Sequence, residues 1–310
     1  MPASQLLDAL LDRTIIASYG RTGPALRKLI GSWPDEPLDL AGKTVVVTGA
    51  TGGIGRAAIG LLAEQGALPV AVGRNPDKVA AVASETGARG EVCDVSDLES
   101  LHAMVERWQE PIDVLVHNAG VMPPERTLTA DRVELAFATN VLGPWYLTEH
   151  LHRHMRAGGR VVNVSSGGMY GQRLDADLQN DDYRPARVYA RTKRAEVVLS
   201  ELWAERLRPD GIVVHAMHPG WALTPGVESS LPTFRKVAAP ILRTPEQGAD
   251  TLLFLAGARS PGECTGLFWH DRRPRPTHAF GLNRETEADR QRLWELCEQL
   301  SRGADHRDRQ

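Results

Sequence analysis

The chain has 310 residues, of which 42% are hydrophobic, and a formal net charge of −3. This length supports one large domain or two small ones, and the near-balanced charge disfavours nucleic acid as the main partner. Cys93, Cys264 and Cys297 are far apart and odd in number, so neither a disulfide framework nor a metal site is predicted. A reducing compartment, the cytoplasm, is therefore expected. No apolar run is long enough to span a bilayer.

Residues 1–41 are predicted to form an N-terminal helical extension. The segment lacks a basic region and carries Asp8 and Asp12 within its apolar part, so it is not typical of a signal peptide. An amphipathic helix would gather on one side Leu6, Leu7, Leu10, Leu11 and Ile15. We expect this helix to pack on its own domain. A peripheral membrane contact is the less favoured alternative, because basic residues are scarce.

From residue 42 onward, β-branched and apolar runs alternate with segments of helical spacing. Strands are predicted at 43–49, 68–74, 89–95, 112–120, 159–166, 211–220 and 265–270. Helices are predicted at 54–66, 76–87, 97–108, 131–155, 187–207 and 245–257. Several strands are apolar on both faces, which is typical of a parallel sheet between two helix layers. The pattern predicts an α/β fold over residues 42–302. This would be a single doubly wound, Rossmann-type domain of about seven parallel strands, followed by a polar tail at 303–310.

A glycine-rich loop, TGATGGIG (48–55), joins the first predicted strand to the first helix. Glycines let the backbone turn sharply and approach a pyrophosphate, which the helix N-terminus then attracts. A tight turn without a ligand is the alternative. The spacing is itself ambiguous, since Gly49 and Gly55 fit one glycine pattern through Gly53 and another through Gly52.

The end of the second predicted strand indicates which dinucleotide is bound. An NAD enzyme usually has a carboxylate there, which accepts a hydrogen bond from the ribose 2′-hydroxyl. Here Gly73 and Arg74 occupy this point. A guanidinium would bind a 2′-phosphate, so NADP(H) is favoured over NAD(H). The alternative is that Arg74 is a solvated loop residue.

Tyr189 and Lys193 lie four residues apart on a predicted helix and therefore share one face. A free phenol is a poor base at neutral pH, but a neighbouring ammonium stabilises the phenolate and lowers its pKa. A lysine also presents a compact charge that can reach a ribose hydroxyl, as the broad guanidinium of arginine cannot. A tyrosine and an exposed lysine that share a helix face by chance would give the same pattern.

Six motifs in one order resemble the short-chain dehydrogenase/reductase family, over roughly residues 42–270. They are TGATGGIG, HNAG (117–120), TNVLGP with Asn140, VVNVSS ending in Ser166, YARTK (189–193) and HPGWALT (218–224). The match favours the single-domain glycine spacing. Features such as SSGGM, VYARTKR and FWHDRRP are similar to the branch called SDR family member 12, with its retinol-dehydrogenase-like neighbours.

The resemblance implies a role for each matching residue. Tyr189 would be the general acid or base, Lys193 would lower its pKa and bind the nicotinamide ribose, and Ser166 would hydrogen-bond the substrate oxygen. Asn140 would kink its helix and hold a water beside Lys193. Ser165 is the alternative to Ser166, and Asn118 and Thr224 have simpler structural explanations. The implied cofactor site consists of Gly49, Thr51, Gly52, Gly53, Ile54, Gly55, Arg74, Asp94, Val95, Asn118, Ala119, Gly120, Tyr189, Lys193, Pro219, Gly220 and Thr224.

Two further segments bear on the substrate. Residues 167–187 form an insert between Ser166 and Tyr189, which we expect to shape the pocket. Residues 221–242 include Trp221, Leu223, Val227, Leu231, Phe234 and Val237. These apolar side chains predict a lipophilic carbonyl or alcohol substrate, with core packing as an equal alternative.

Other polar and aromatic groups have simpler explanations. His150, His152 and His154 are more typical of a solvated helix face than of a metal site, because a third ligand is not evident. His270-Asp271 is interpreted as a turn at a strand end, and the stripe around Trp294 as packing or a subunit contact.

The sequence therefore predicts an NADP(H)-dependent oxidoreductase that interconverts a carbonyl and an alcohol. A dinucleotide-binding sensor without turnover is the alternative, and a nucleotide-sugar epimerase is a weaker one, because the chain lacks room for a larger substrate domain. A homo-oligomer is possible in any of these cases.

Overall fold

The computed structural model describes residues 3–12, 14, 18–175, 183–222, 239–278 and 284–305. An eight-stranded sheet forms its centre, in the order β3-β2-β1-β4-β5-β6-β7-β8. Its strands are β1 Thr44–Thr48, β2 Leu68–Gly73, β3 Arg89–Val92, β4 Ile112–His117, β5 Met155–Val164, β6 Val213–His218, β7 Leu267–His270 and β8 Arg273–Arg275. The first seven strands run parallel, and β8 pairs antiparallel with β7. The strand order reverses between β1 and β4, where ligands bind in doubly wound sheets.

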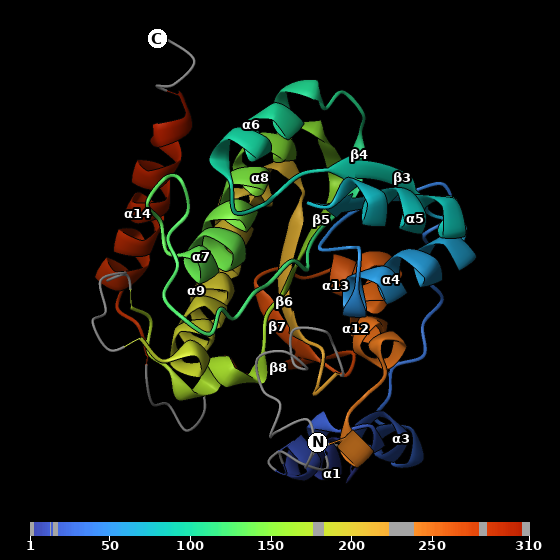
Figure 1. Ribbon diagram of the computed structural model, residues 1–310. Helices are drawn as coiled ribbons and strands as arrows, with labels where there is room; N and C mark the ends of the chain where they lie inside the picture. The colour runs from blue at the N-terminus through green and yellow to red at the C-terminus, as the bar shows by residue number, and fades with distance from the viewer. Residues whose placement is uncertain are drawn as a thin grey trace.

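Helices cover both faces of this sheet (Figure 1). One face packs against α6, α8 and α9, with α14 outside them, through Leu101, Trp145, Val198, Trp203 and Trp294. The other face packs against α4 and α12, through Ile59, Leu62, Leu252 and Phe254. Between two such layers the strands must be apolar on both sides, which explains the valine-rich runs.

From residue 42 onward, the helices of nine or more residues are α4 Gly53–Glu64, α5 Pro76–Thr86, α6 Leu98–Arg107, α8 Gly143–Leu151, α9 Pro185–Arg206, α12 Pro245–Gly257 and α14 Glu287–Asp305. The other helices are α1 Ala3–Asp12, α3 Thr22–Leu29, α7 Leu135–Phe137 and α13 Arg259–Gly262. A π-helical turn, η1, covers Ala138–Leu142, and 3-10 turns cover η2 His152–His154, η3 Gly167–Gly171, η4 Arg208–Asp210 and η5 Ala239–Ile241. The helix α14 continues three residues past Arg302, into the predicted polar tail.

The long helix predicted over roughly 131–155 is present, but it starts at Leu135 and finishes at His154. Arg132 has a positive φ of 62° in a turn, and the carboxylate of Glu134 then caps the helix by accepting from the backbone N–H groups of Ala136 and Phe137. At the other end, the helical segment finishes at His154, and Met155 already belongs to β5, where it pairs with Ile112. The segment therefore contains a turn, a helix with a π-helical turn, and the start of a strand.

The N-terminal extension packs on its own domain, but not through its leucines. Leu6, Leu7 and Leu10 are 50–59% exposed, whereas Asp8 is buried and bonds Arg27 of α3 and Arg275 of β8. The extension therefore packs on its own domain, as expected, and ion pairs hold α1 beside β8 (Figure 1). Ile15 lies outside the described residues. No helix in the described part of the chain is long and apolar enough to cross a membrane.

Candidate active site

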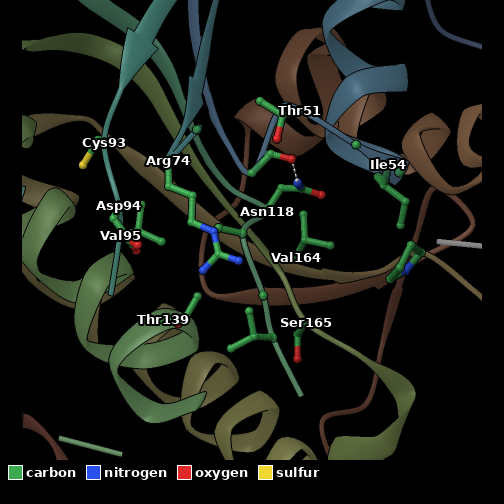
Figure 2. Close-up of a pocket in the computed structure, with 18 of the residues that line it drawn as sticks. Thr51, Ile54, Arg74, Cys93, Asp94, Val95, Asn118, Thr139, Val164 and Ser165 are labelled. Carbon is green, nitrogen blue, oxygen red and sulfur yellow. Dashed lines mark hydrogen bonds between the residues drawn. The ribbon is translucent and has the colours of Figure 1, made fainter. Parts of the chain in front are cut away.

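A cleft of about 400 Å³ opens at the carboxyl ends of β1, β2, β4 and β5. Its lining includes most of the predicted cofactor residues: Gly49, Thr51, Gly52, Gly53, Ile54, Arg74, Asp94, Val95, Asn118, Ala119, Gly120, Tyr189, Lys193 and Pro219. The lining residues come from eight separate stretches of the chain and meet where the strand order reverses (Figure 2). This is the position at which a doubly wound sheet binds its ligand.

The glycine loop forms the wall of the cleft next to α4. Gly49 has a positive φ of 65°, and a Cβ there would lie 2.7 Å from the Ala119 backbone. A side chain on Gly55 would collide with Asn118 and with the Gly49 carbonyl. Gly55 does not line the cleft, so its role is to let α4 approach the loop. The first turn of α4 leaves backbone N–H groups for an anion.

Asn118 holds this loop from the end of β4. Its amide nitrogen donates to the carbonyls of Thr48 at 2.9 Å and Gly49 at 3.2 Å (Figure 2). Its backbone N–H, like that of Ala119, donates to the Thr48 hydroxyl. These bonds fix the ends of β1 and β4 against each other, so Asn118 braces the loop as well as lining the cleft.

Arg74 follows directly after β2 and reaches into the cleft (Figure 2). Its side chain is exposed and has no hydrogen bond or ion pair to other described residues. The nearby carboxylate of Asp94 is already engaged, because it accepts from the backbone N–H and the hydroxyl of Ser96. The guanidinium is therefore available to an anionic ligand at the β2 end of the cleft.

Asn140 lies in the π-helical turn η1 and is fully buried. Its side-chain nitrogen donates to the Val121 carbonyl and to the Thr192 hydroxyl, and its oxygen accepts from the Val121 backbone N–H. A π turn disturbs the regular pattern of backbone hydrogen bonds, which is common at functional sites. The side chain thus ties the loop after β4 to the middle of α9.

Two adjacent serines, Ser165 and Ser166, follow directly after β5 and have different surroundings. Ser165 is buried, lines the cleft and donates to the Lys193 carbonyl at 2.8 Å. Ser166 is half-buried, accepts from the Gly168 backbone N–H, and lies close enough to the Tyr189 phenol to lower the phenol pKa. Only Ser166 therefore combines partial exposure with a contact to Tyr189.

Tyr189 and Lys193 share one face of α9, with the Lys193 ammonium 5.4 Å from the centre of the Tyr189 ring. Burial raises the pKa of Tyr189, and Lys193 lowers it in part. The ammonium donates to the Val164 carbonyl at 2.9 Å and to the Glu196 carboxylate at 2.7 Å. Burial opposes the charge on Lys193, but Glu196 and Tyr189 outweigh this effect and raise its pKa.

The segment after β6 completes the cleft and meets the N-terminal extension. Pro219 lines the cleft, whereas Gly220 has a φ of 78° and lies against the Arg243 side chain. Tyr19 packs edge-on against His218, with ring centres 4.5 Å apart, and also contacts Trp221. The His218 ring accepts from the Gly167 backbone N–H. The extension therefore supports the backbone next to Ser166.

A buried cluster of ion pairs anchors this region. Asp271, in the turn after β7, bonds both Arg27 and Arg243. Burial opposes its charge, but His270 and the two arginines hold the pKa of Asp271 well below its ordinary value. The expected turn at His270-Asp271 is confirmed.

Some expectations fall outside the described residues. Thr224 and the apolar side chains of Leu223, Val227, Leu231, Phe234 and Val237 belong to 223–238, which the structure does not describe. In the insert, Met169 packs in the core, and Tyr183 donates to the Pro123 carbonyl. Residues 176–182 are not described.

The remaining alternatives concern metals and packing. Trp294 packs against Trp145 and Trp203, so its stripe belongs to the core. Within the described ranges, no cluster of three acidic, histidine or cysteine side chains could hold a metal ion.

The cleft also contains residues that sequence reasoning did not assign: Gly73, Cys93, Val121, Thr139, Val164 and Ser165. Most of these lie at or just beyond a strand end, and that position is the signal that would have identified them.

The fold and the cleft define a dinucleotide-binding protein of the doubly wound class. A family model described as short chain dehydrogenase matches residues 43–233. The chain belongs to the short-chain dehydrogenase/reductase family and is an oxidoreductase with a Rossmann-type NAD(P)-binding fold.

Named relatives agree with this assignment. Dehydrogenase/reductase SDR family member 12 of Bos taurus is 36% identical over 286 residues, which cover 87% of this chain and 90% of the relative. Retinol dehydrogenase 12 of Mus musculus is 32% identical, with 90% and 93% covered. Among solved structures, BdcA in complex with NADPH is 26% identical with a TM-score of 0.62, over 74% of this chain and 92% of that one.

Proposed function

We propose that this protein is an NADP(H)-dependent oxidoreductase that interconverts a lipophilic ketone or aldehyde and its alcohol, with Tyr189 as the acid or base. The observation that carries the proposal is the arrangement of Ser166, Tyr189 and Lys193, of which Tyr189 and Lys193 line the cleft. The Tyr189 phenol lies near Ser166, which lowers its pKa, and beside the ammonium of Lys193. This arrangement can bind a carbonyl oxygen and give it a proton.

Tyr189 acts as the proton donor in carbonyl reduction. Burial raises its pKa, so the phenol stays protonated at neutral pH in the protein alone. The adjacent ammonium stabilises the phenolate that forms when the proton leaves. In alcohol oxidation the same phenolate accepts the proton, and Ser166 donates a hydrogen bond to the substrate oxygen in either direction.

Lys193 and Asn140 lie near this phenol, and their remaining hydrogen-bonding groups limit what each can bind. Lys193 has one N–H left after its bonds to Val164 and Glu196, and we assign it to the nicotinamide ribose. Both N–H groups of the Asn140 side chain are already used. Any water that Asn140 holds beside Lys193 would therefore donate to the side-chain oxygen or to the backbone carbonyl oxygen of Asn140.

The residues of the cleft fit a dinucleotide. At Gly49 and Gly55 a Cβ would collide with Ala119 and Asn118, so these glycines let the loop pack closely beside α4, whose first backbone N–H groups would bind the pyrophosphate. Arg74 supports NADP(H), because its guanidinium has no partner among the described residues and would bind a 2′-phosphate, whereas Oδ1 of the nearby Asp94 already accepts from Ser96. When bound, the nicotinamide supplies or accepts the hydride.

The lipophilic substrate is supported by the composition of 221–242 and by a relative named as a retinol dehydrogenase. Of the six apolar residues named in this segment, Trp221 is the one that the structure describes, and it lies beside Tyr19. We further propose a cytoplasmic location, with a small molecule rather than a nucleic acid as partner.

The test is absorbance at 340 nm with NADPH or NADH and a panel of aliphatic, aromatic and polyene aldehydes and ketones. Cofactor binding is measured separately by calorimetry. We expect turnover of long apolar carbonyls with NADPH. Tight binding of NADPH without turnover of any carbonyl or alcohol would instead identify a dinucleotide-binding sensor.

A further inference from the structure

Glu196 is a buried carboxylate that contacts the proposed catalytic residues. It lies three residues after Lys193 on α9, and its side chain is only 4% exposed. Its Oε1 accepts from the Lys193 ammonium at 2.7 Å. Its Oε2 has no hydrogen-bond partner among the described residues. A buried carboxylate with a free oxygen is costly unless other polar groups surround it.

Those polar groups line a small cavity of about 10 Å³ next to Glu196. Its walls include Trp145, Thr148, Asn163 and Trp203. The indole nitrogens of Trp145 and Trp203 are also buried and without hydrogen-bond partners in the described part of the chain. The three side chains that carry these unpartnered atoms thus line one small space, which is about as large as one water molecule.

We propose that Glu196 is a positioning residue, whose carboxylate directs the Lys193 ammonium and offsets its charge, and which thereby sets how readily Tyr189 gives up its proton. This inference rests on the function proposed above. An ammonium has three N–H donors, and the Val164 carbonyl and Glu196 take two of them. The third is left for the cleft, where a Cβ on Gly120 would lie 3.3 Å from the nitrogen.

The charges around Tyr189 support this role. Burial raises the pKa of Tyr189, Lys193 lowers it and Glu196 raises it again. Burial also raises the pKa of Glu196 to about 7, against the effects of Lys193 and Ser165. On β4, His117 reaches this region through Thr148 and stays neutral, because burial lowers its pKa to about 3. The neighbouring Arg194 of α9 is paired with Glu285.

The test is the pH profile of kcat in both directions for Glu196→Gln, with Glu205→Gln as the matched control. Glu205 lies on the same helix but is 65% exposed. Without the carboxylate, Lys193 acts on Tyr189 unopposed. The midpoint assigned to Tyr189 should therefore move to lower pH by roughly half a unit or more, and E205Q should leave it unchanged. A folded E196Q protein with the wild-type midpoint overturns the inference.

Two additions keep the test decisive. If E196Q does not fold, Glu196→Asp withdraws the carboxylate from the ammonium, and a smaller shift of the same sign is expected. An unchanged midpoint in E196D contradicts the inference equally. If the wild-type protein shows no turnover, the proposed function fails by itself. Absorbance titration at 295 nm with NADP⁺ bound, taken as the difference from Y189F, then measures the phenol directly and must show the same shift.

Discussion

The amide nitrogen of Asn140 donates to the Thr192 hydroxyl at 2.9 Å and so connects the π-helical turn η1 to the helix that carries Tyr189 and Lys193. Thr192 in turn donates to the Tyr189 carbonyl at 2.8 Å. The Thr192 hydroxyl thus accepts a hydrogen bond from Asn140 and donates one to the backbone of Tyr189. The relative position of Asn140 and Tyr189 depends on this hydroxyl.

Replacing Thr192 with valine keeps the shape but removes the hydroxyl. We expect kcat/KM to fall about tenfold, since a lost buried hydrogen bond costs about 1–1.5 kcal/mol and leaves the Asn140 amide unsatisfied. Steady-state kinetics and the thermal midpoint are the measurements. Thr86→Val is the control, because the Thr86 hydroxyl also bonds a helix carbonyl but lies outside the cleft. Equal activity of the Thr192→Val and wild-type proteins would contradict the connection.

Tyr189→Phe removes the proposed acid and base alone. We expect kcat to fall by about 10²–10⁴-fold, the usual contribution of general acid–base catalysis. NADPH affinity should change little, because Lys193 and the glycine loop remain. Tyr170→Phe is the control, since its hydroxyl donates to the Pro276 carbonyl and lies outside the cleft. Retention of full activity by Tyr189→Phe would refute the assigned role.

Arg74→Ala tests the choice of cofactor. Loss of a charge-assisted contact with the 2′-phosphate should raise the Kd for NADPH by about 10–100-fold, or about 1.5–3 kcal/mol. The Kd for NADH, which lacks this phosphate, should stay nearly constant. Calorimetry with both nucleotides measures the effect, and Arg56→Ala, whose side chain pairs with Glu85, is the control. A similar loss for NADH would show that Arg74 does not read the phosphate.

Buried histidines should lower the free energy of unfolding as the pH falls from about 6.5 towards 4. Burial lowers the pKa of His117 to about 3 and that of His270 to about 4, and it also lowers the pKa values of His215 and His218. Below pH ~6.5 the unfolded chain therefore binds more protons than the folded one. Each such histidine then reduces the free energy of unfolding by up to about 1.4 kcal/mol per pH unit.

Glu196 acts with the opposite sign, because its raised pKa of about 7 makes the folded state bind the extra proton between its ordinary pKa and pH 7. Four histidines outweigh one carboxyl group, so stability should fall overall from pH 6.5 to pH 5. Urea unfolding at pH 7.0, 6.0 and 5.0 measures this. A free energy of unfolding that rises as the pH falls would show that the histidines are not buried in their neutral form.

Local patterns predicted the seven parallel strands, since alternating apolar strands and helices leave few other arrangements. They did not predict β8. Arg273–Arg275 is short, charged and contains a proline, so nothing local marks it as a strand, and its pairing with β7 comes from tertiary contacts. The break near Arg132 was missed for a similar reason, because a non-glycine residue with positive φ leaves no sequence pattern.

Most of the residues predicted to bind the cofactor line one cleft, because they follow strand ends in recognisable motifs. Glu196 was missed, since a carboxylate three residues from a lysine on a helix is typical of a solvated pair. Its burial depends on Trp145 and Trp203, which come from α8 and from a later turn of α9. The sequence of the N-terminal helix did not indicate that Asp8 is buried, because this burial depends on ion pairs with the distant Arg27 and Arg275.

The two chain ends that flank residues 223–238 are fixed to each other and to the N-terminal extension. The Arg243 backbone N–H donates to the Trp221 carbonyl, and Trp221 donates to the Tyr19 carbonyl. Ala222 and Arg243 form a parallel bridge. Residues 223–238 therefore start and finish at two points of the chain that are bonded to each other. Exchange of this segment for that of a relative, with the predicted cofactor residue Thr224 retained, would test whether it sets the choice of substrate.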